Sequence, residues 1–251
     1  MNSAGGRSRQ VFLTAEWRHL AMVSYSVDPT ILHPYVPAGT ELDLWNGEAL
    51  VSVIGFRFLD TRVLGIGIPF HRNFEEVNLR FYVRSNRSGQ VRHGVTFIRE
   101  LVPRRAIAAA GRAAYNEPYI AVPMLSTVSA NTAGAKSVEY RWKSSRKRGA
   151  GWCGLRVEAP GTTEPAVPLS DSQACFVSEH YWGYTRQRDG RTLEYEVEHA
   201  RWRVWPEATA SLEGDLAPWY GPALSEILRA KPCSVCLAEG SAVKVFKPTR
   251  L

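Results

Sequence analysis

The sequence lacks the short motifs that identify the most common enzyme classes. It contains no GxSxG nucleophile elbow, no phosphate-binding P-loop, no HExxH pair and no GxGxxG dinucleotide fingerprint. These absences exclude the commonest hydrolase, kinase and dehydrogenase interpretations. Because no cofactor-binding motif is present, we expect a protein that works without a cofactor.

Long hydrophobic runs are also missing. No apolar run approaches the roughly 18 residues that indicate a membrane-spanning helix. The polar, Gly/Ser-rich start lacks the apolar segment of roughly 7–15 residues typical of a secretory signal. We therefore expect a cytoplasmic protein without membrane association, in which residues 1–10 form a flexible tail and residues 11–251 a single domain.

Cysteine is scarce, with four residues among 251. Two of them form a single CxxC motif, Cys233-Ser-Val-Cys236. Structural zinc takes four ligands, and neither a second CxxC nor a close histidine pair completes the set. We therefore expect no metal ion, and we interpret the cysteines as small buried hydrophobic residues.

Lysine is scarce as well, because 6 of the 31 basic residues are lysines and the other 25 are arginines. The net charge of +7 suggests a nucleic-acid partner, since basic side chains release counterions from phosphates. However, the one dense basic cluster, residues 141–148, lies in a polar stretch typical of a solvated loop, with a phosphate-binding loop as the alternative. No RNP, KH or zinc-finger pattern supports nucleic-acid binding, so we do not expect it.

Turn signals divide much of the chain into short apolar segments. Asn46-Gly47 and Asp189-Gly190 are typical two-residue hairpin turns. The predicted hairpins join 41–45 to 48–59, 74–84 to 90–101 and 179–186 to 191–205; further strands are predicted at 137–143, 152–158, 235–237 and 241–246. Helices are expected after Asp28-Pro29, over 104–116, from Ser170 and from Pro222. The pattern predicts a mainly β fold, a sandwich or barrel with peripheral helices.

Residues 74–84 form the most informative predicted strand. Apolar Val77, Leu79, Phe81 and Val83 alternate with polar Glu76, Asn78, Arg80, Tyr82 and Arg84. Side chains alternate across a strand, so one face is apolar and the other polar. The polar face either meets water on a half-exposed sheet or turns into the ligand cavity of a barrel.

The end of the following strand offers a candidate anion site. Glu100 lies shortly before a predicted helix that opens with Arg104 and Arg105. Helix N-termini favour negative charge, and an arginine can bind a carboxylate through two parallel hydrogen bonds. The alternative is a surface arginine pair bridged to a nearby glutamate, worth roughly 0–1 kcal/mol.

Three histidines are candidates for proton transfer or ligand contact. His180 and His199 lie on strands that the hairpin pattern pairs, and each has glutamates close by in sequence. Such a histidine could act as a general base near neutral pH, or it could simply make structural hydrogen bonds. His71 lies in a predicted loop at the start of the polar strand and could contact a ligand there.

Several longer strings together resemble one known family. They are Phe12–Arg18, Val36–Asp43, Pro69–Val83, Phe97–Arg105, Tyr115–Tyr119, Glu179–Tyr184 and Glu194–His199. On these residues the chain resembles the bacterial domain-of-unknown-function family 2071 over nearly its whole length. That family is similar to acetoacetate decarboxylases, and the resemblance implies an antiparallel barrel or cone around a small polar cavity.

The resemblance also bears on chemistry. Acetoacetate decarboxylases use a lysine that forms a Schiff base with a β-keto acid, within an Arg-Glu, spacer, Pro-Lys-Lys motif. Here residues 99–105 resemble a shortened version in which Arg104 and Arg105 stand at the two lysine positions. Arginine stays protonated and cannot form a Schiff base. Lys244 is flanked by apolar residues, but such a lysine usually reaches water. We therefore predict no Schiff-base decarboxylation.

Two hypotheses follow for function. In the first, the chain binds a small organic acid or carbonyl-containing ligand. Its candidate ligand-binding residues are Arg80, Tyr82, Arg104, Arg105 and His71. In the second, it is a lyase- or isomerase-type enzyme on a small keto acid. Glu76, Glu100 and His180 would then carry the acid–base chemistry. The sequence leaves open whether any reaction is catalysed and whether the protein is a homo-oligomer.

Overall fold

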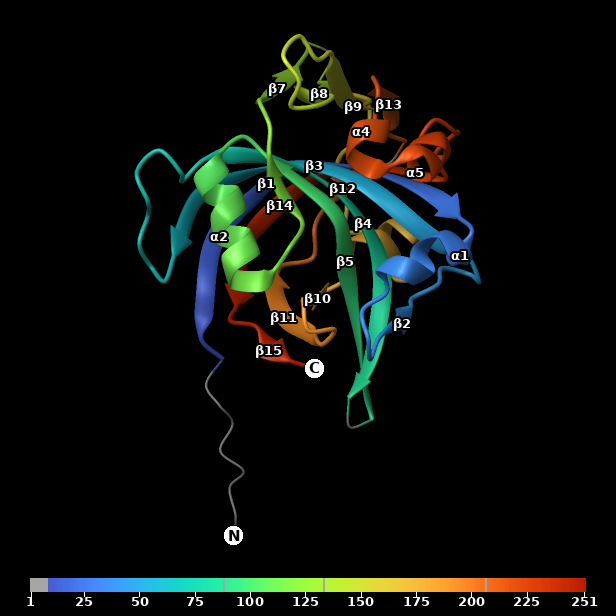
Figure 1. The fold of residues 1–251 in the computed structure, drawn as a ribbon. Helices are drawn as coiled ribbons and strands as arrows, with labels where there is room; N and C mark the ends of the chain where they lie inside the picture. The colour runs from blue at the N-terminus through green and yellow to red at the C-terminus, as the bar shows by residue number, and fades with distance from the viewer. Residues whose placement is uncertain (1–8, 88, 133, 206) are drawn as a thin grey trace.

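The computed structural model describes residues 9–87, 89–132, 134–205 and 207–251. In this part of the chain, strands form one 11-stranded sheet and one 4-stranded sheet, with short helices between them (Figure 1). No helix in the same part is long and apolar enough to cross a membrane. The prediction of a mainly β protein with peripheral helices is confirmed.

The larger sheet curls until its strand pairings return to their start. Its main strands, in order, are β14 (Ser234–Phe246), β1 (Val11–Val27), β3 (Ala49–Val63), β4 (Phe74–Arg87), β5 (Gln90–Val102), β10 (Trp182–Arg186) and β11 (Thr192–His199). Because β11 pairs with β14, with Val197 opposite Val245, the path of pairings is closed. Short strands β2 (Glu41–Leu42), β6 (Tyr119–Ala121), β12 (Val204–Trp205) and β15 (Thr249–Arg250) join it. We call this sheet the curled sheet.

The smaller sheet lies across the outer face of the curled sheet (Figure 1). Its strands, in order, are β13 (Thr209–Glu213), β9 (Trp152–Ala159), β8 (Lys136–Lys143) and β7 (Met124–Ala130). The helices are α1 (Pro29–Leu32), η1 (His33–Tyr35), α2 (Arg105–Tyr115), α3 (Gln173–Ser178), α4 (Ala217–Tyr220) and α5 (Pro222–Ile227). The predicted helices are all present, and the Asp28 carboxylate caps α1 by accepting from the Thr30 amide.

Strand β4 is buried on both faces, which decides between the two interpretations of its alternation. Its apolar side chains join Tyr140 and Trp142 of the smaller sheet in one hydrophobic cluster. Its polar side chains point the other way, where Glu76 and Asn78 are each 2% exposed. The polar face therefore lies inside the curled sheet, and the half-exposed alternative is wrong.

One predicted strand pairing and the expected purely antiparallel arrangement differ from the structure. Asn46-Gly47 forms a turn closed by a bridge between Trp45 and Glu48, but β2 pairs with β4 instead of β3. The reason is that β1 and β4 already occupy both edges of β3. In addition, β5 pairs in parallel with β10 and with β6, so the larger sheet is not purely antiparallel.

A bulge in β5 determines which of its side chains face inward. Leu79 lies opposite Arg99 and Arg80 opposite Phe97, so Ile98 is an extra residue in the ladder. A bulge of this kind shifts the side-chain alternation by one residue. As a result Glu100 faces the interior of the curled sheet, and the Arg99 guanidinium instead donates to the Trp219 carbonyl.

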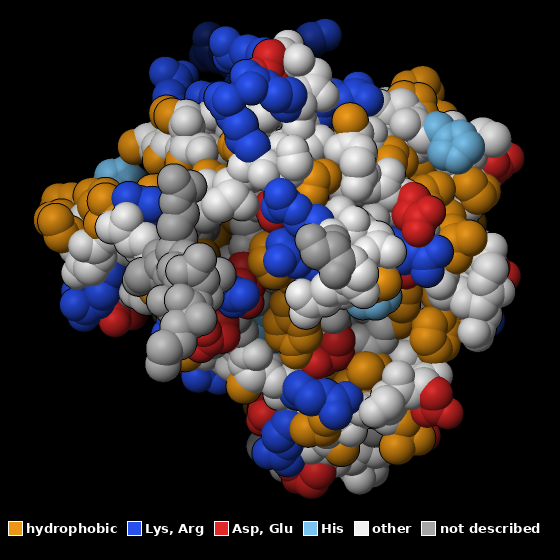
Figure 2. Space-filling model, turned by 90° about the horizontal axis from the view of Figure 1, so that it is seen from below, with side chains coloured by type: hydrophobic (Ala, Val, Ile, Leu, Met, Phe, Trp, Pro, Cys, Tyr) orange, Lys and Arg blue, Asp and Glu red, His pale blue; other side chains and the backbone are white. Residues whose placement is uncertain are grey.

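Basic residues are spread over the surface. On the face seen in Figure 2, Lys and Arg side chains occur at several separate places. Of the basic cluster predicted as a loop, Arg146, Lys147 and Arg148 lie in the connection between β8 and β9, whereas Arg141 and Lys143 lie on β8, where the loop prediction is wrong. The Arg141 and Lys143 side chains lie 5.5 and 4.4 Å from the Trp152 ring centre. Nucleic-acid binding by this loop stays an untested interpretation.

Contact between the two sheets leaves no room for a side chain at Gly55. A Cβ placed there would lie 2.5 Å from Cδ2 of the fully buried Tyr140. We expect Gly55→Ala to destabilise the protein by about 1–3 kcal/mol through overpacking, seen as a lower Tm. Gly154→Ala in β9 is the matched control, because its Cβ would meet only contacts of 3.8 Å or more. Equal Tm values for the two variants would contradict this packing.

Candidate functional site

The curled sheet encloses a cavity of about 290 Å³. Most of its wall is apolar, with aromatic side chains such as Trp17, Phe56, Phe58 and Phe74. Helix α2 covers part of the cavity with the face that carries Ile107, Ala110 and Gly111. Ile68, in the loop between β3 and β4, lines the cavity and is 47% exposed, so the cavity meets solvent there.

Three glutamates form a buried carboxyl cluster on the cavity wall, and we use this name for Glu76, Glu100 and Glu117. Each is at most 3% exposed. Glu76 comes from the inner face of β4, and Glu100 comes from β5 just after the bulge. Glu117 lies between α2 and β6, next to Pro118, whose carbonyl accepts from the Glu100 backbone amide.

Hydrogen bonds fix two members of the carboxyl cluster. Glu76 accepts from the Asn78 amide and from the Tyr119 hydroxyl, each at 3.0 Å. Glu117 accepts on one oxygen from the Thr185 hydroxyl at 2.5 Å and the Tyr195 hydroxyl at 2.8 Å. The carboxyl groups are therefore held by side chains from several separate strands.

Burial makes these carboxyl groups weak acids. It raises the pKa of Glu76 to about 7, against the opposing effects of its hydrogen bonds and of Arg80. Burial likewise raises the pKa of Glu117 to about 7. The pKa of Glu100 is raised well above its usual range, first by burial and then by the neighbouring Glu117 and Glu76 carboxylates. At neutral pH the carboxyl cluster thus contains both protonated and ionised groups.

Arg80 places a positive charge beside the carboxyl cluster. It is 9% exposed, and one terminal nitrogen donates to the Val177 carbonyl at 2.7 Å. The guanidinium carbon lies 5.6 Å from the ring centre of Tyr82. This leaves the Arg80 Nε donor buried without a protein acceptor among the described residues.

Other buried polar atoms around the cavity also lack a hydrogen-bond partner. Six buried polar atoms on cavity-lining residues have no hydrogen-bond partner in the described part of the chain: Trp17 Nε1, Thr61 Oγ1, Asn78 Oδ1, Arg80 Nε, Glu100 Oε2 and His180 Nδ1. Burying such an atom unsatisfied costs about 1–3 kcal/mol. Their gathering in one cavity therefore points to a polar ligand that satisfies several of them at once.

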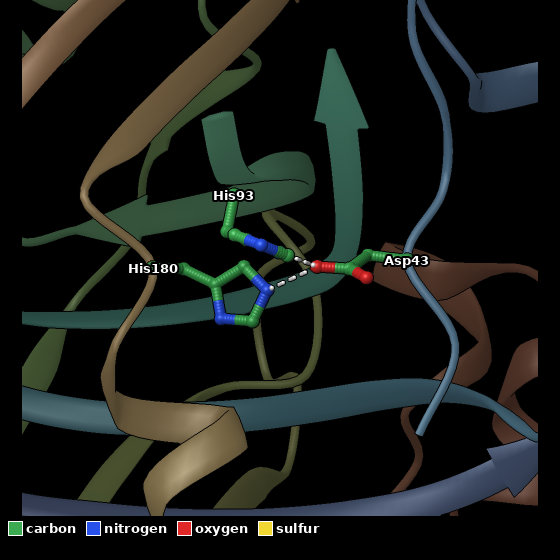
Figure 3. Close-up of side chains that lie close together, drawn as sticks. All are labelled: Asp43, His93 and His180. Carbon is green, nitrogen blue, oxygen red and sulfur yellow. Dashed lines mark hydrogen bonds and ion pairs between the residues drawn. The ribbon is translucent and has the colours of Figure 1, made fainter. Parts of the chain in front are cut away.

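His180 reaches the cavity from the segment between α3 and β10, and its other ring nitrogen is paired. Its Nε2 lies 3.0 Å from Oδ2 of Asp43, and Nδ1 of His93 lies 2.5 Å from the same oxygen (Figure 3). Burial lowers the pKa of His180, against the opposing effect of Asp43. Of the described residues, these three have ligand atoms close enough together, within 4.8 Å, to hold a metal ion.

The structure brings most of the sequence-predicted site residues to this cavity. Its lining includes Glu76, Arg80, Glu100, His180 and His71, together with His199. The Tyr82 side chain is buried beneath Arg80 and His180, and its hydroxyl pairs with Ser52. Arg104 and Arg105 lie at the start of α2 outside the cavity lining, where Arg105 is exposed.

Sequence reasoning did not single out Glu117, Asp43 or His93. Glu117 and Asp43 both lie outside long strands, in segments that carry no alternation signal. His93 lies on a predicted strand, but its relation to Asp43 depends on contact between positions 50 residues apart. The one available signal was that Glu117 and Asp43 fall within strings that resemble the family.

None of the six lysines lines the cavity. Lys244 donates to Glu198 on the exposed surface, as predicted for a lysine that reaches water. Lys136 and Lys143 lie over the rings of Trp205 and Trp152. The absence of Schiff-base decarboxylation stays a prediction.

Comparison with known families decides the relationship that the sequence suggests. Residues 14–242 match the family of uncharacterised conserved proteins known as domain of unknown function 2071. The chain belongs to this family. The uncharacterised protein YqjF of Bacillus subtilis strain 168 is 28% identical over 190 residues, which cover 74% of this chain and 72% of YqjF.

Solved structures with the same fold are acetoacetate decarboxylase-like. Acetoacetate decarboxylase of Legionella pneumophila superposes with a TM-score of 0.65 at 15% identity, covering 100% of this chain and 92% of that one. The enduracididine biosynthesis enzyme MppR, complexed with pyruvate, gives 0.61 at 12% identity, covering 98% and 93%. An acetoacetate decarboxylase-like enzyme of Sphingomonas wittichii RW1 gives 0.61 at 13% identity, covering 96% and 94%. At these identities the similarity establishes the fold.

The raised carboxyl pKa values predict how stability depends on pH. In the unfolded chain these glutamates titrate near pH 4.5, whereas the folded chain keeps their protons to about pH 7 and above. The proton-dependent stabilisation is therefore lost progressively as pH rises from about 4.5 through about 7, and in the last part of this range, between about pH 6.5 and 7.5, we expect Tm to fall. The lowered pKa of His180 acts below this window, because unfolded histidine is neutral above about 6.5.

A variant pair tests the source of this pH dependence. Glu100→Gln removes one carboxyl group and its repulsion of the other two, so Tm should fall less steeply with pH. Glu213→Gln, at an exposed position of β13, should leave the slope unchanged. A Tm that is constant or rises over the same pH range in the wild type would contradict the raised pKa values.

Proposed function

We propose that the cavity binds a carbonyl-containing acid and catalyses proton transfer next to its carbonyl group. The observation that carries this proposal is the buried carboxyl cluster beside Arg80 on the wall of a single cavity. This makes the chain an isomerase- or lyase-type enzyme without a Schiff-base lysine. The simpler alternative is a binding module, in which the same ligand is bound but not converted.

The pKa values support acid–base work. A general acid or base is most effective when its pKa lies near the working pH, and Glu76 and Glu117 have pKa values of about 7. Burial and the neighbouring carboxylates raise the pKa of Glu100 well above its usual range, and in its protonated form Glu100 can donate to a carbonyl oxygen. One carboxyl group can thus remove a proton while its neighbour stabilises the enolate oxygen.

Arg80 supports the choice of an acid as the ligand. Its buried, unpartnered Nε and its remaining terminal nitrogen can donate to a carboxylate. The MppR structure complexed with pyruvate supports a 2-oxo acid as a ligand for this fold. The aromatic wall and the volume of about 290 Å³ further favour an acid that carries an apolar substituent.

Hydrogen–deuterium exchange on candidate acids tests the proposal. We expect the protein to accelerate incorporation of solvent deuterium at C3 of a 2-oxo acid, followed by proton NMR with pyruvate, 2-oxobutanoate and phenylpyruvate. Glu76→Gln should reduce the exchange rate by about 10²–10⁴-fold, as expected for loss of a general base.

Glu75→Gln is the matched control for this experiment. Glu75 is the neighbouring residue on β4, but it faces the other way and accepts from Ser126 of the smaller sheet. Its substitution should leave the exchange rate unchanged. No exchange above the uncatalysed rate with any of the three acids, or equal losses in both variants, would refute acid–base catalysis by the carboxyl cluster.

A further inference from the structure

Asp43 connects two imidazole rings through a single carboxylate oxygen. His93 Nδ1 and His180 Nε2 lie 2.5 and 3.0 Å from its Oδ2. Figure 3 shows both rings directed at that oxygen. The three residues come from distant parts of the chain: after β2, on β5, and between α3 and β10. None of them is needed for the carboxyl-cluster chemistry described above.

The hydrogen bonds determine the tautomer of His180. The bonds from His180 and His93 together outweigh burial and lower the pKa of Asp43, so Asp43 is an anion that only accepts. Each ring nitrogen facing it must therefore carry a proton. Neutral His180 then has its proton on Nε2 and a lone pair on Nδ1. Since Asp43 is outside the cavity lining and His180 is in it, Nδ1 is the nitrogen available to a cavity ligand.

The surroundings of His180 bury this lone pair and leave it without a protein partner among the described residues. Its side chain is 3% exposed, and its Nδ1 has no partner among the described residues. The Tyr82 and Phe176 rings pack on it at 4.8 Å. Its charged and titratable neighbours are Asp43, which favours the imidazolium form, and Arg80 and His93, which oppose it.

We propose that Asp43 is a positioning residue that holds His180 with its Nδ1 lone pair toward the cavity, as an acceptor for a hydroxyl or enol group of the ligand. In the proton-transfer step the ligand O–H gives its proton to Nδ1, and Asp43 stabilises the resulting imidazolium. Together with Arg80, this subsite selects a hydroxy acid or the enol form of an oxo acid. The proposal rests on the cavity being a ligand site, as in the proposed function.

A divalent metal held by the same three atoms is the competing interpretation, and the geometry favours hydrogen bonds. The 3.0 Å between His180 Nε2 and Asp43 Oδ2 is an ordinary hydrogen-bond distance, and at 2.5 Å His93 Nδ1 is in direct contact with the same oxygen. Two ligands about 2.0–2.2 Å from a tetrahedral metal ion would lie more than 3 Å apart. A metal would also take the Nε2 lone pair of His180 and leave the proton on Nδ1. The two interpretations thus predict opposite tautomers.

Nitrogen-15 NMR of the full chain with labelled histidine distinguishes them without any ligand. At about pH 7 we expect neutral His180 with a protonated Nε2 and an unprotonated Nδ1, both with added EDTA and with added Zn²⁺. Asp43→Ala should abolish this tautomer preference. Asp43→Asn, which keeps an acceptor for folding, should keep the tautomer and lower the pKa of His180 because the carboxylate charge is gone.

His93→Ala is a useful second variant because the His93 side chain is 51% exposed. Under the proposal it leaves the His180 tautomer unchanged, since the Asp43–His180 bond remains. His33→Ala, at an exposed position of η1, is its matched control. A protonated Nδ1 on His180, or Zn²⁺ binding that His93→Ala abolishes and His33→Ala does not, would overturn the proposal in favour of a metal site.

A matched ligand pair tests the selectivity. We expect 3-phenyllactate to bind about five- to tenfold more tightly than 3-phenylpropanoate, which lacks only the hydroxyl group. Titration calorimetry with the wild type and Asp43→Ala should show that the variant loses this preference. Equal affinities in the wild type, or no binding of either acid, would overturn the subsite. Failure of deuterium exchange with a correct tautomer would refute the catalytic function alone.

Discussion

Strand β4 is buried on both faces, and this burial determines both the packing of the two sheets and the chemistry of the cavity. Its apolar face packs under the smaller sheet, and its polar face lies in a mainly apolar cavity. Removing Glu76 and its neighbours from water raises their pKa values. The same packing that stabilises the two layers thus creates carboxyl groups that titrate near neutral pH, which water-exposed glutamates do not.

Local patterns in the sequence predicted the elements better than their partners. The alternation in residues 74–84 and the turn at Asp189-Gly190 led to β4, β10 and β11 as found. The pairing of β2 with β4 was missed because it depends on which strand edges are already occupied. The closure between β11 and β14 was equally hidden, since it joins residues such as Val197 and Val245 that are far apart in sequence.

In the candidate site too, the sequence predicted the residues on strands better than those that only long-range contacts bring in. Glu76, Arg80 and Glu100 were predicted from strand alternation and the family resemblance, and the bulge at Ile98 gives Glu100 its inward direction. Arg104 and Arg105 were chosen from their place at a helix start, but the face of α2 that lines the cavity begins beyond them. Asp43, His93 and Glu117 join the site through contacts that only the folded chain brings together.

The proposed acid–base chemistry requires that burial raise the pKa values of the carboxyl cluster well above those of exposed glutamates. The most direct test is a carbon-13 NMR titration of the glutamate side-chain carboxyl carbons, assigned with Glu76→Gln, Glu100→Gln and Glu117→Gln variants. We expect midpoints near pH 7 for Glu76 and Glu117 and a midpoint well above the usual glutamate range for Glu100. Midpoints near pH 4.5 for all three, the value of exposed glutamates, would contradict it.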